Sequence, residues 1–354
     1  MNLQGHIAHL DGWRGLAISA VFFGHFVSKA QYWWVGTFGV ALFFVLSGFL
    51  MCNILFFKST KLPDFFARRI IRVGPTFVLF VLAITVYAST MQPVRYTPSA
   101  TEVLSTLLFL RSYLPSNSGI INDDWPIGHL WSLNVEEHTY IFLAIAALCA
   151  RKLNRRWMTA AILLVATTSA FYFSVYYVLH PASGNGTPAY FRSEAASLGI
   201  LAAVSLSYIK RSWSHRVFDR IHPLLPVVSL AVAFVCFTDP LRWRGFHLII
   251  APLCLAFTIN FLDRLPAAFI RLLSNERLCW IGRISFSLYI WQQPFHFAVC
   301  HYDMNAWLAV LLAVGLGLVS FYGFENPVRL WLTQAWDVRK SNTSQVGQAI
   351  IILK

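Results

Sequence analysis

Long apolar segments recur along the whole chain, and they constrain the fold more than any other feature. Of the 354 residues, 57% are hydrophobic and only 12% are charged, a balance that does not describe a soluble globular domain. A bilayer core about 30 Å thick needs roughly 20 apolar residues in a helix. Stretches of about that length predict spans near residues 14–34, 37–57, 70–90, 130–150, 157–179, 190–209, 223–238, 246–262, 280–300 and 306–325. We therefore expect an all-α, polytopic integral membrane protein with about ten transmembrane helices.

The connection between residues 91 and 129 contains a shorter apolar piece. Residues 103–110 reach about half the length of a span, which predicts a re-entrant or interfacial segment. The first fourteen residues are polar and do not resemble a signal peptide, so the first apolar segment is expected to be retained as a span. We expect a transmembrane domain over residues 1–335 and a short cytoplasmic tail over residues 336–354.

The net charge of +13 would raise the question of nucleic acid binding in a soluble protein. With the N-terminus inside, however, 22 of the 28 Lys and Arg residues fall on the cytoplasmic side of the expected spans. Basic residues collect in short cytoplasmic loops of membrane proteins. The distribution therefore predicts an N-in, C-in topology and no nucleic acid partner. The six cysteines are scattered singly, so neither a disulfide framework nor a metal site is expected.

Ionisable side chains inside predicted spans are costly, which makes them candidates for function. His25 follows Arg14 by eleven residues, and on a regular helix this spacing places both on one face about 16 Å apart. Arg14 is expected near the cytoplasmic mouth and His25 deeper in the membrane. The alternative is that His25 bonds to a neighbouring helix and serves packing alone.

The segment GHLWSLNVEEHTY holds a second set of polar residues. Ser132 and Glu136 are four residues apart and share a helix face, with His129 one turn earlier. A carboxylate in this position can orient or polarise an imidazole from another helix. The alternative is that Glu136, Glu137 and His138 are interfacial residues at a helix start, where acidic groups also favour the helix dipole.

The segment FFARRIIRVGP carries Arg69 and Arg72 on one face, beside Arg68. The planar donor fork of arginine suits phosphate, and the segment lies at the predicted cytoplasmic mouth. The preference of basic residues for cytoplasmic ends explains such a cluster equally well. Both interpretations stand on these residues alone.

Five ordered motifs resemble those of the bacterial integral-membrane acyltransferase family 3, whose members are O-acyltransferases of cell-surface polysaccharides. LDGWRGLAISAVFFGH is similar to the signature of the family's first helix, and GVALFFVLSGFL to that of the second. FFARRIIRVGP resembles the arginine pair of the third helix, HLWSLNVEEHTY the Trp-Ser-Leu-x-Val-Glu-Glu motif, and GRISFSLYIWQQP with FENPVR the closing motifs. The chain departs from the family at Ala41, where many members have an acidic residue, and at His138, where Gln is common.

The resemblance implies a stand-alone acyltransferase of the bacterial cytoplasmic (inner) membrane. An acyl group, usually acetyl, is expected to come from acyl-CoA, with acetyl-CoA as the expected donor. It is expected to reach a hydroxyl on a surface glycan or its lipid-linked precursor. Arg14, Arg69 and Arg72 are the expected contacts to the polyanionic donor. Many family members carry a C-terminal SGNH-type hydrolase domain, which this chain is expected to lack, and no metal is expected.

The resemblance also implies catalytic roles for three residues. His25 is the expected general base that takes the proton from the acceptor hydroxyl. Glu136 is expected to orient or stabilise the imidazolium. Ser132 is expected to donate a hydrogen bond to His25, Glu136 or the developing oxyanion. Direct transfer and an acyl-enzyme on His25 or Ser132 are both compatible with these residues.

A second function is compatible with the same ionisable groups. His25 and Glu136 would form the proton relay of a secondary transporter. Transporters with about ten spans often contain an inverted repeat, and no internal repeat is visible in this chain. The sequence therefore favours the acyltransferase, although it does not identify the acceptor.

Overall fold

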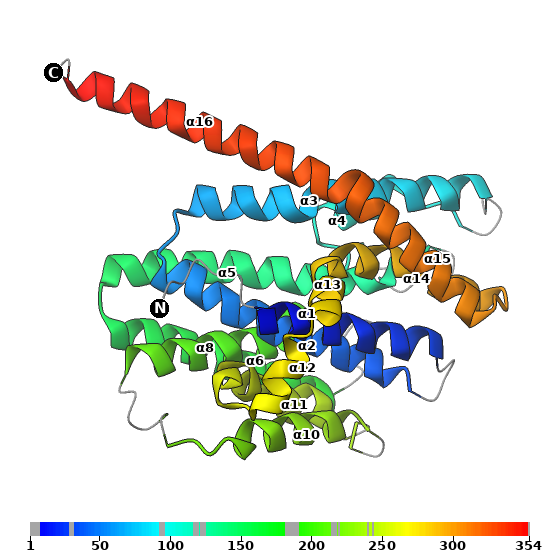
Figure 1. Cartoon of the computed structure of the whole chain (residues 1–354), viewed down its shortest axis with the longest axis horizontal. Coiled ribbons are helices and arrows are strands. Elements are labelled where there is room, and N and C mark those ends of the chain that lie inside the picture. The colour runs from blue at the N-terminus through cyan, green and yellow to red at the C-terminus, as the bar shows by residue number, and fades with distance from the viewer. Residues whose placement is uncertain are drawn as a thin grey trace.

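The chain folds entirely into helices within the residues that the structure describes. The structure is a computed structural model and describes residues 8–27, 32–91, 96–115, 120, 125–180, 191–213, 218, 220–238, 241–242 and 244–352, with side chains as far as residue 340. Every regular element in these ranges is helical, as the composition predicts. Figure 1 shows the helices running mostly along the long axis of the molecule.

The helices coincide with the apolar segments that the sequence predicts. Each expected span has a matching helix, and several continue into a π-helical turn. They are α1 (Ala8–Phe22) with the π-helix Phe23–Val27, α2 (Trp34–Met51) with Cys52–Phe57, α3 (Leu62–Met91), α5 (Trp131–Leu153), α6 (Arg156–Leu179), α8 (Leu198–Ser212), α10 (Leu224–Phe237), α11 (Phe246–Asn260), α13 (Glu276–Arg283) with α14 (Ser285–His301), and α15 (Ala306–Ser320) with Phe321–Glu325. The short helices α7 (Ser193–Ala196) and α12 (Ala267–Leu273) and the 27-residue α16 (Asn326–Ile352) complete the set used below.

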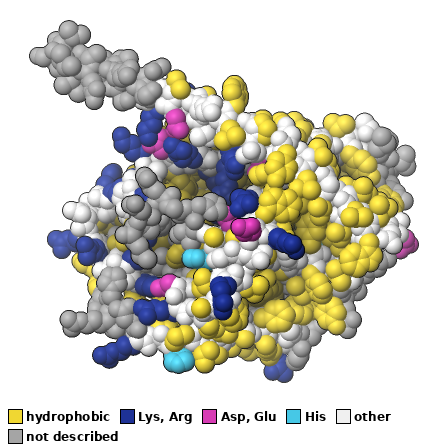
Figure 2. All heavy atoms as spheres, viewed as in Figure 1, with side chains coloured by type: hydrophobic (Ala, Val, Ile, Leu, Met, Phe, Trp, Pro, Cys, Tyr) yellow, Lys and Arg dark blue, Asp and Glu magenta, His cyan; other side chains and the backbone are white. Residues whose placement is uncertain are grey.

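Four helical stretches are long and apolar enough to cross a membrane: Trp34–Phe57, Leu62–Thr90, Arg156–Leu179 and Ala306–Lys340. Two shorter apolar helices, α10 and α11, accompany them. Large apolar side chains on these helices face outward; Val165 is 66% exposed and Leu311 69%. Figure 2 shows hydrophobic side chains covering much of the right-hand part of the molecule, while Lys and Arg concentrate toward the left, where α3 begins and α5 ends. The number of spans and their orientation stay predictions.

The connection between α3 and α5 is held in place by a buried ion pair. The short helix α4 (Ala100–Leu107) begins with a capping box, in which the side chains of Ser99 and Glu102 bond to each other's backbone N–H. Glu102 also accepts from Arg111 at 3.0 Å and from Tyr96. At eight residues, α4 has about half the length of a span, in agreement with the short apolar piece expected there.

Helix α1 lies at the centre of the helical packing and contacts α2, α12, α13 and α14. A Cβ at Gly282 of α13 would stand 1.9 Å from the carbonyl oxygen of Asp11, so only glycine allows this approach. On the opposite side, the Trp13 indole donates to the Leu42 carbonyl of α2 at 3.0 Å. These contacts fix the helix that carries Arg14 and His25.

Helix α16 extends well beyond the body of the protein (Figure 1). Its first half lies along the start of α3, where Asp337 pairs with Arg68 at 3.0 Å and Lys340 with Asp64 at 2.6 Å. The helix continues without a break across the expected boundary between residues 335 and 336. Residues 353–354 of the expected tail lie outside the described residues, and the division into a domain and a tail stays a prediction.

Candidate active site

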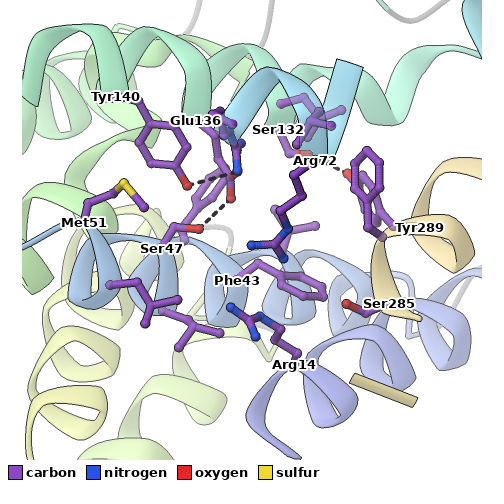
Figure 3. A pocket seen from close by; sticks show the side chains of 18 residues that line it. Arg14, Phe43, Ser47, Met51, Arg72, Ser132, Glu136, Tyr140, Ser285 and Tyr289 are labelled. Atoms are coloured by element: carbon purple, nitrogen blue, oxygen red, sulfur yellow. Dashed lines mark hydrogen bonds and ion pairs between the residues drawn. The ribbon is translucent and has the colours of Figure 1, made fainter. Parts of the chain in front are cut away.

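A polar cavity opens among α1, α2, α3, α5 and α14. It has about 800 Å³ of empty space, including the solvent at its mouth, and we call it the inner cavity. Its lining includes Arg14, Ser47, Arg72, Glu136 and Tyr289. Figure 3 shows these side chains around the opening. Five residues that sequence analysis singled out therefore meet in one place: Arg14, Arg69, Arg72, Ser132 and Glu136.

Arg72 presents an uncompensated charge to the inner cavity. Its side chain is exposed there and makes no hydrogen bond or ion pair with any residue that the structure describes. Arg14 reaches into the same space from the opposite side (Figure 3), with Nη1 2.8 Å from Oδ1 of Asp11. Two guanidinium groups facing one confined space repel each other. An anion with several oxygens, such as a phosphate, would remove that repulsion and satisfy the free donors of Arg72.

Arg69, by contrast, is fully engaged by the protein. Its Nη2 lies 2.8 Å from Oε2 of Glu136 and its Nε 2.7 Å from Oε1 of Glu137. The guanidinium also stacks over the ring of Tyr140, 4.5 Å from its centroid. Glu136 accepts a further hydrogen bond from Ser47 at 2.8 Å. Arg69 thus connects α3 to α5 while it also lines the inner cavity, and its predicted contact with the donor stays a prediction.

A second cavity, with about 920 Å³ of empty space, lies against the first. It is lined by the end of the α1 π-helix, the start of α2, the residues before α5 and the second half of α14, and we call it the outer cavity. His25 is found here, with Nδ1 2.7 Å from Oε1 of the fully buried Gln292. Its ring stacks on His296, with centroids 4.3 Å apart.

Two side chains form the wall between the cavities. Val40 and Tyr289 are the described residues that line both. The Tyr289 hydroxyl donates to the carbonyl of His129 at 2.8 Å and shares a hydrogen bond with Ser132 Oγ at 2.6 Å. Ser132 lines the inner cavity alone and is joined to this wall through the Tyr289 hydroxyl.

The structure divides the predicted site into two parts. Arg14 and His25 line different cavities, and Glu136 is not in hydrogen-bond contact with His25. The physical reason is that each group has a nearer partner: Arg69 for the carboxylate and Gln292 for the imidazole. Sequence reasoning did not assign a role to Gln292, although two glutamines directly after the mostly apolar run SLYIW, inside a predicted span, were a signal. Among the described residues, no group of three or more His, Cys, Asp or Glu side chains could hold a metal ion.

Comparisons with known proteins identify relatives of this chain. The chain is 22% identical over 377 residues to O-acetyltransferase OatA of Staphylococcus aureus, covering 98% of this chain and 61% of that protein. It is 24% identical over 362 residues to peptidoglycan O-acetyltransferase OatA of Listeria monocytogenes, covering 92% of this chain and 56% of that protein. The chain thus spans about three fifths of these relatives. No solved structure matches it.

The family assignment comes from a separate comparison. The sequence profile of a family described as an acyltransferase domain matches residues 7–324, a range that includes all residues of both cavities. Three observations agree on the same family: the helices long and apolar enough to cross a membrane, the ordered motifs, and this match. The chain belongs to the acyltransferase family 3 of integral membrane proteins.

Proposed function

We propose that this protein is a transmembrane O-acetyltransferase that moves an acetyl group from cytoplasmic acetyl-CoA to a hydroxyl of a cell-surface glycan or its lipid-linked precursor. The observation that carries the proposal is Arg72, whose guanidinium faces the inner cavity without a described partner and opposite Arg14. This is the chemistry that a polyanionic donor requires. The proposed setting is the bacterial cytoplasmic membrane, with about ten spans and both termini inside.

In that orientation the inner cavity opens toward the cytoplasm, because its lining includes the first half of α3, the end of α2 and the start of α14, which lie on that side. Arg14 and Arg72 would hold the phosphates or the pantetheine arm of CoA. The thioester would then lie against Val40 and Tyr289, the wall shared with the outer cavity. The acceptor would enter from the opposite side of the membrane and meet the thioester there.

His25 is the proposed general base. The amide oxygen of Gln292 can only accept a hydrogen bond, so Nδ1 of His25 carries the hydrogen and Nε2 keeps its lone pair. Nε2 takes the proton from the acceptor hydroxyl as the hydroxyl oxygen attacks the thioester carbonyl carbon. The carbon–sulfur bond then breaks and the proton passes to the sulfur, leaving a sugar ester and free CoA. Ser132, joined to the wall through the Tyr289 hydroxyl, is the proposed donor to the developing oxyanion.

Glu136 acts in this scheme through Arg69. It holds the guanidinium and the Ser47 hydroxyl in place, and so shapes the inner cavity. The alternative function, a transporter with a proton relay between His25 and Glu136, needs these groups to exchange protons. They line different cavities, with Val40 and Tyr289 between them, so the geometry supports the acyltransferase better.

The test is transfer of labelled acetyl from acetyl-CoA to membrane glycan by the purified full chain in detergent. His25→Ala is expected to abolish transfer while the protein stays folded, because no other described group occupies its position beside Gln292. His138→Gln is the matched control, since His138 lines neither cavity. Undiminished transfer by His25→Ala would exclude the mechanism. Proton-driven uptake of a solute into proteoliposomes, without any dependence on acyl-CoA, would favour the transporter.

A further inference from the structure

The outer cavity differs from the inner cavity in its charge. None of its described lining residues is Asp, Glu, Lys or Arg, whereas the inner cavity is lined by three arginines and a glutamate. Its polar side chains are histidines, a glutamine, a threonine and a cysteine. An ionised ligand group held away from water needs a partner of opposite charge. Apart from its histidines, which are neutral in the proposed mechanism, the outer cavity offers none in its described lining, which favours an uncharged ligand.

Aromatic rings supply much of the remaining wall. Trp131 and Phe191 lie with ring centroids 5.1 Å apart, and Phe297 and Tyr289 also line the space. Apolar walls with a few convergent polar groups are typical of small-ligand sites. A pyranose ring fits such a site, because its C–H faces pack on aromatic rings while its hydroxyl groups point sideways to hydrogen-bonding groups.

His129 is the clearest sign that a ligand group belongs here. Its side chain is buried and lines the outer cavity, and neither Nδ1 nor Nε2 makes a hydrogen bond of regular geometry with a described residue, although the backbone of Ile290 lies against the ring. The ring is held between Phe80, at 5.3 Å, and Tyr289, at 5.2 Å. Buried polar atoms are nearly always hydrogen-bonded. A neutral imidazole offers one donor and one acceptor, and a sugar hydroxyl can satisfy either.

We propose that the outer cavity binds an uncharged sugar as the acetyl acceptor and that His129 bonds to one of its hydroxyl groups. The inference rests on the proposed function and narrows it: the acceptor residue is a neutral hexose or N-acetylhexosamine unit, and a uronic acid or a phosphorylated sugar is excluded. His25 then meets the hydroxyl that reacts, and His129 holds a neighbouring one.

The first experiment compares acceptors that differ only in charge. The purified full chain is given acetyl-CoA and either methyl glucoside, galactoside, mannoside or N-acetylglucosaminide, or the corresponding methyl glucuronide and galacturonide. At least one neutral glycoside is expected to be acetylated with a kcat/KM about tenfold or more above that of its uronide, because the carboxylate has no partner in the cavity. Equal or better use of the uronides would overturn the proposal.

The second experiment tests His129. His129→Leu is expected to raise the KM for the neutral glycoside roughly tenfold, the value of one hydrogen bond, with the KM for acetyl-CoA unchanged. His129→Gln, which keeps a donor and an acceptor, should recover part of the loss. Thermal stability of His129→Leu should match or exceed that of the unmodified protein, since the ring nitrogens have no hydrogen bond of regular geometry to lose, only the weak contact with the backbone of Ile290.

His138→Leu is the matched control for that variant. Its Nδ1 bonds to Ser193 Oγ at 2.7 Å, and it lines neither the inner nor the outer cavity. It should lose thermal stability without a change in the KM for the glycoside. If His129→Leu instead loses stability and leaves the glycoside KM unchanged, His129 is a structural residue and its proposed contact is wrong.

Sugar binding measured in the absence of acetyl-CoA tests the neutral-sugar site independently of the proposed activity. Saturation-transfer NMR on the full chain in detergent is expected to show the neutral glycosides bound, the uronides unbound, and binding weakened by His129→Leu. If the neutral glycosides bind but no acetyl transfer is detected, the proposed O-acetyltransferase activity is wrong, while the neutral-sugar site is supported. Acetyl transfer to native membrane glycan, with no neutral glycoside either bound or acetylated, would retain the enzyme and reject the site.

Discussion

Arg69 and Glu136 form an ion pair, with Nη2 of the arginine 2.8 Å from Oε2 of the glutamate. Both side chains are largely buried, at 14% and 13% exposure, and Glu137 provides a second carboxylate for the same guanidinium. The pair joins the arginine motif of α3 to the glutamate motif of α5. Arg69 and Arg72 look equivalent in the sequence, but the structure distinguishes them. Arg69 forms ion pairs with the protein, and Arg72 forms none with any described residue.

Removing Arg69 should therefore damage the fold. Arg69→Gln leaves Glu136 and Glu137 without their shared counter-charge, and we expect the free energy of unfolding to fall by about 3–5 kcal/mol, as for other broken buried ion pairs. Thermal unfolding in detergent measures the loss, and adding Glu137→Gln should restore part of it. A variant of normal stability with a raised KM for acetyl-CoA would instead make Arg69 a donor contact.

Removing Arg72 should affect donor binding alone. Arg72→Gln is expected to raise the KM for acetyl-CoA roughly 10- to 100-fold, which corresponds to one or more hydrogen bonds to a charged group. Stability should stay constant or rise, because the repulsion from Arg14 is relieved. Arg155→Gln, at an exposed position before α6, is the control and should change neither quantity. If Arg72→Gln and Arg155→Gln have equal effects, these arginines serve only to orient the protein in the membrane.

Gln292 is expected to position the imidazole of His25. Gln292→Leu removes the acceptor 2.7 Å from Nδ1, so the ring loses the contact that fixes its tautomer and orientation. We expect kcat to fall about 100-fold, within the range that general base catalysis contributes, with both KM values unchanged. Gln292→Glu keeps an acceptor and should retain more activity than Gln292→Leu. Steady-state kinetics that show only a KM change would exclude a positioning role.

Gly36 gives His25 the space it needs. A Cβ at this position would stand 3.2 Å from Cδ2 and 3.3 Å from Nε2 of the imidazole. Gly36→Ala should lower kcat by about tenfold or more, because a small displacement of a catalytic group is costly. Gly323→Ala is the control, since a Cβ there meets nothing within 4 Å. Initial rates of acetyl transfer distinguish the two variants, and equal rates would show that the ring can shift without loss.

The positions of the helices followed from the sequence because the length of an apolar segment is a local property. The pairing of side chains did not, since it depends on how helices cross. His25 and Glu136 are polar residues in separate motifs, and only the packing of α14 against α1 shows that Gln292 is nearer to the imidazole. The π-helical turn Phe23–Val27 around His25 also departs from the regular helix assumed for the Arg14 spacing. The roles of the six predicted residues stay predictions.

His129 shows what a sequence motif conceals. It was visible one turn before Ser132, yet its proposed role depends on burial and on the lack of a hydrogen bond of regular geometry to either nitrogen from the described residues. Neither property can be deduced from spacing. The neutral lining of the outer cavity is similarly a property of several helices at once, because its residues come from five separate stretches of the chain.

The wall formed by Val40 and Tyr289 has a consequence for the energised membrane. In the proposed orientation, water can enter each cavity from its own side, so most of the transmembrane voltage would fall across this thin barrier. In the proposed reaction the acetyl group passes from CoA to the sugar at this barrier, and neither CoA nor the sugar has to cross it. The protein can therefore remain sealed to protons and ions through every turnover, with no rocking of helix bundles.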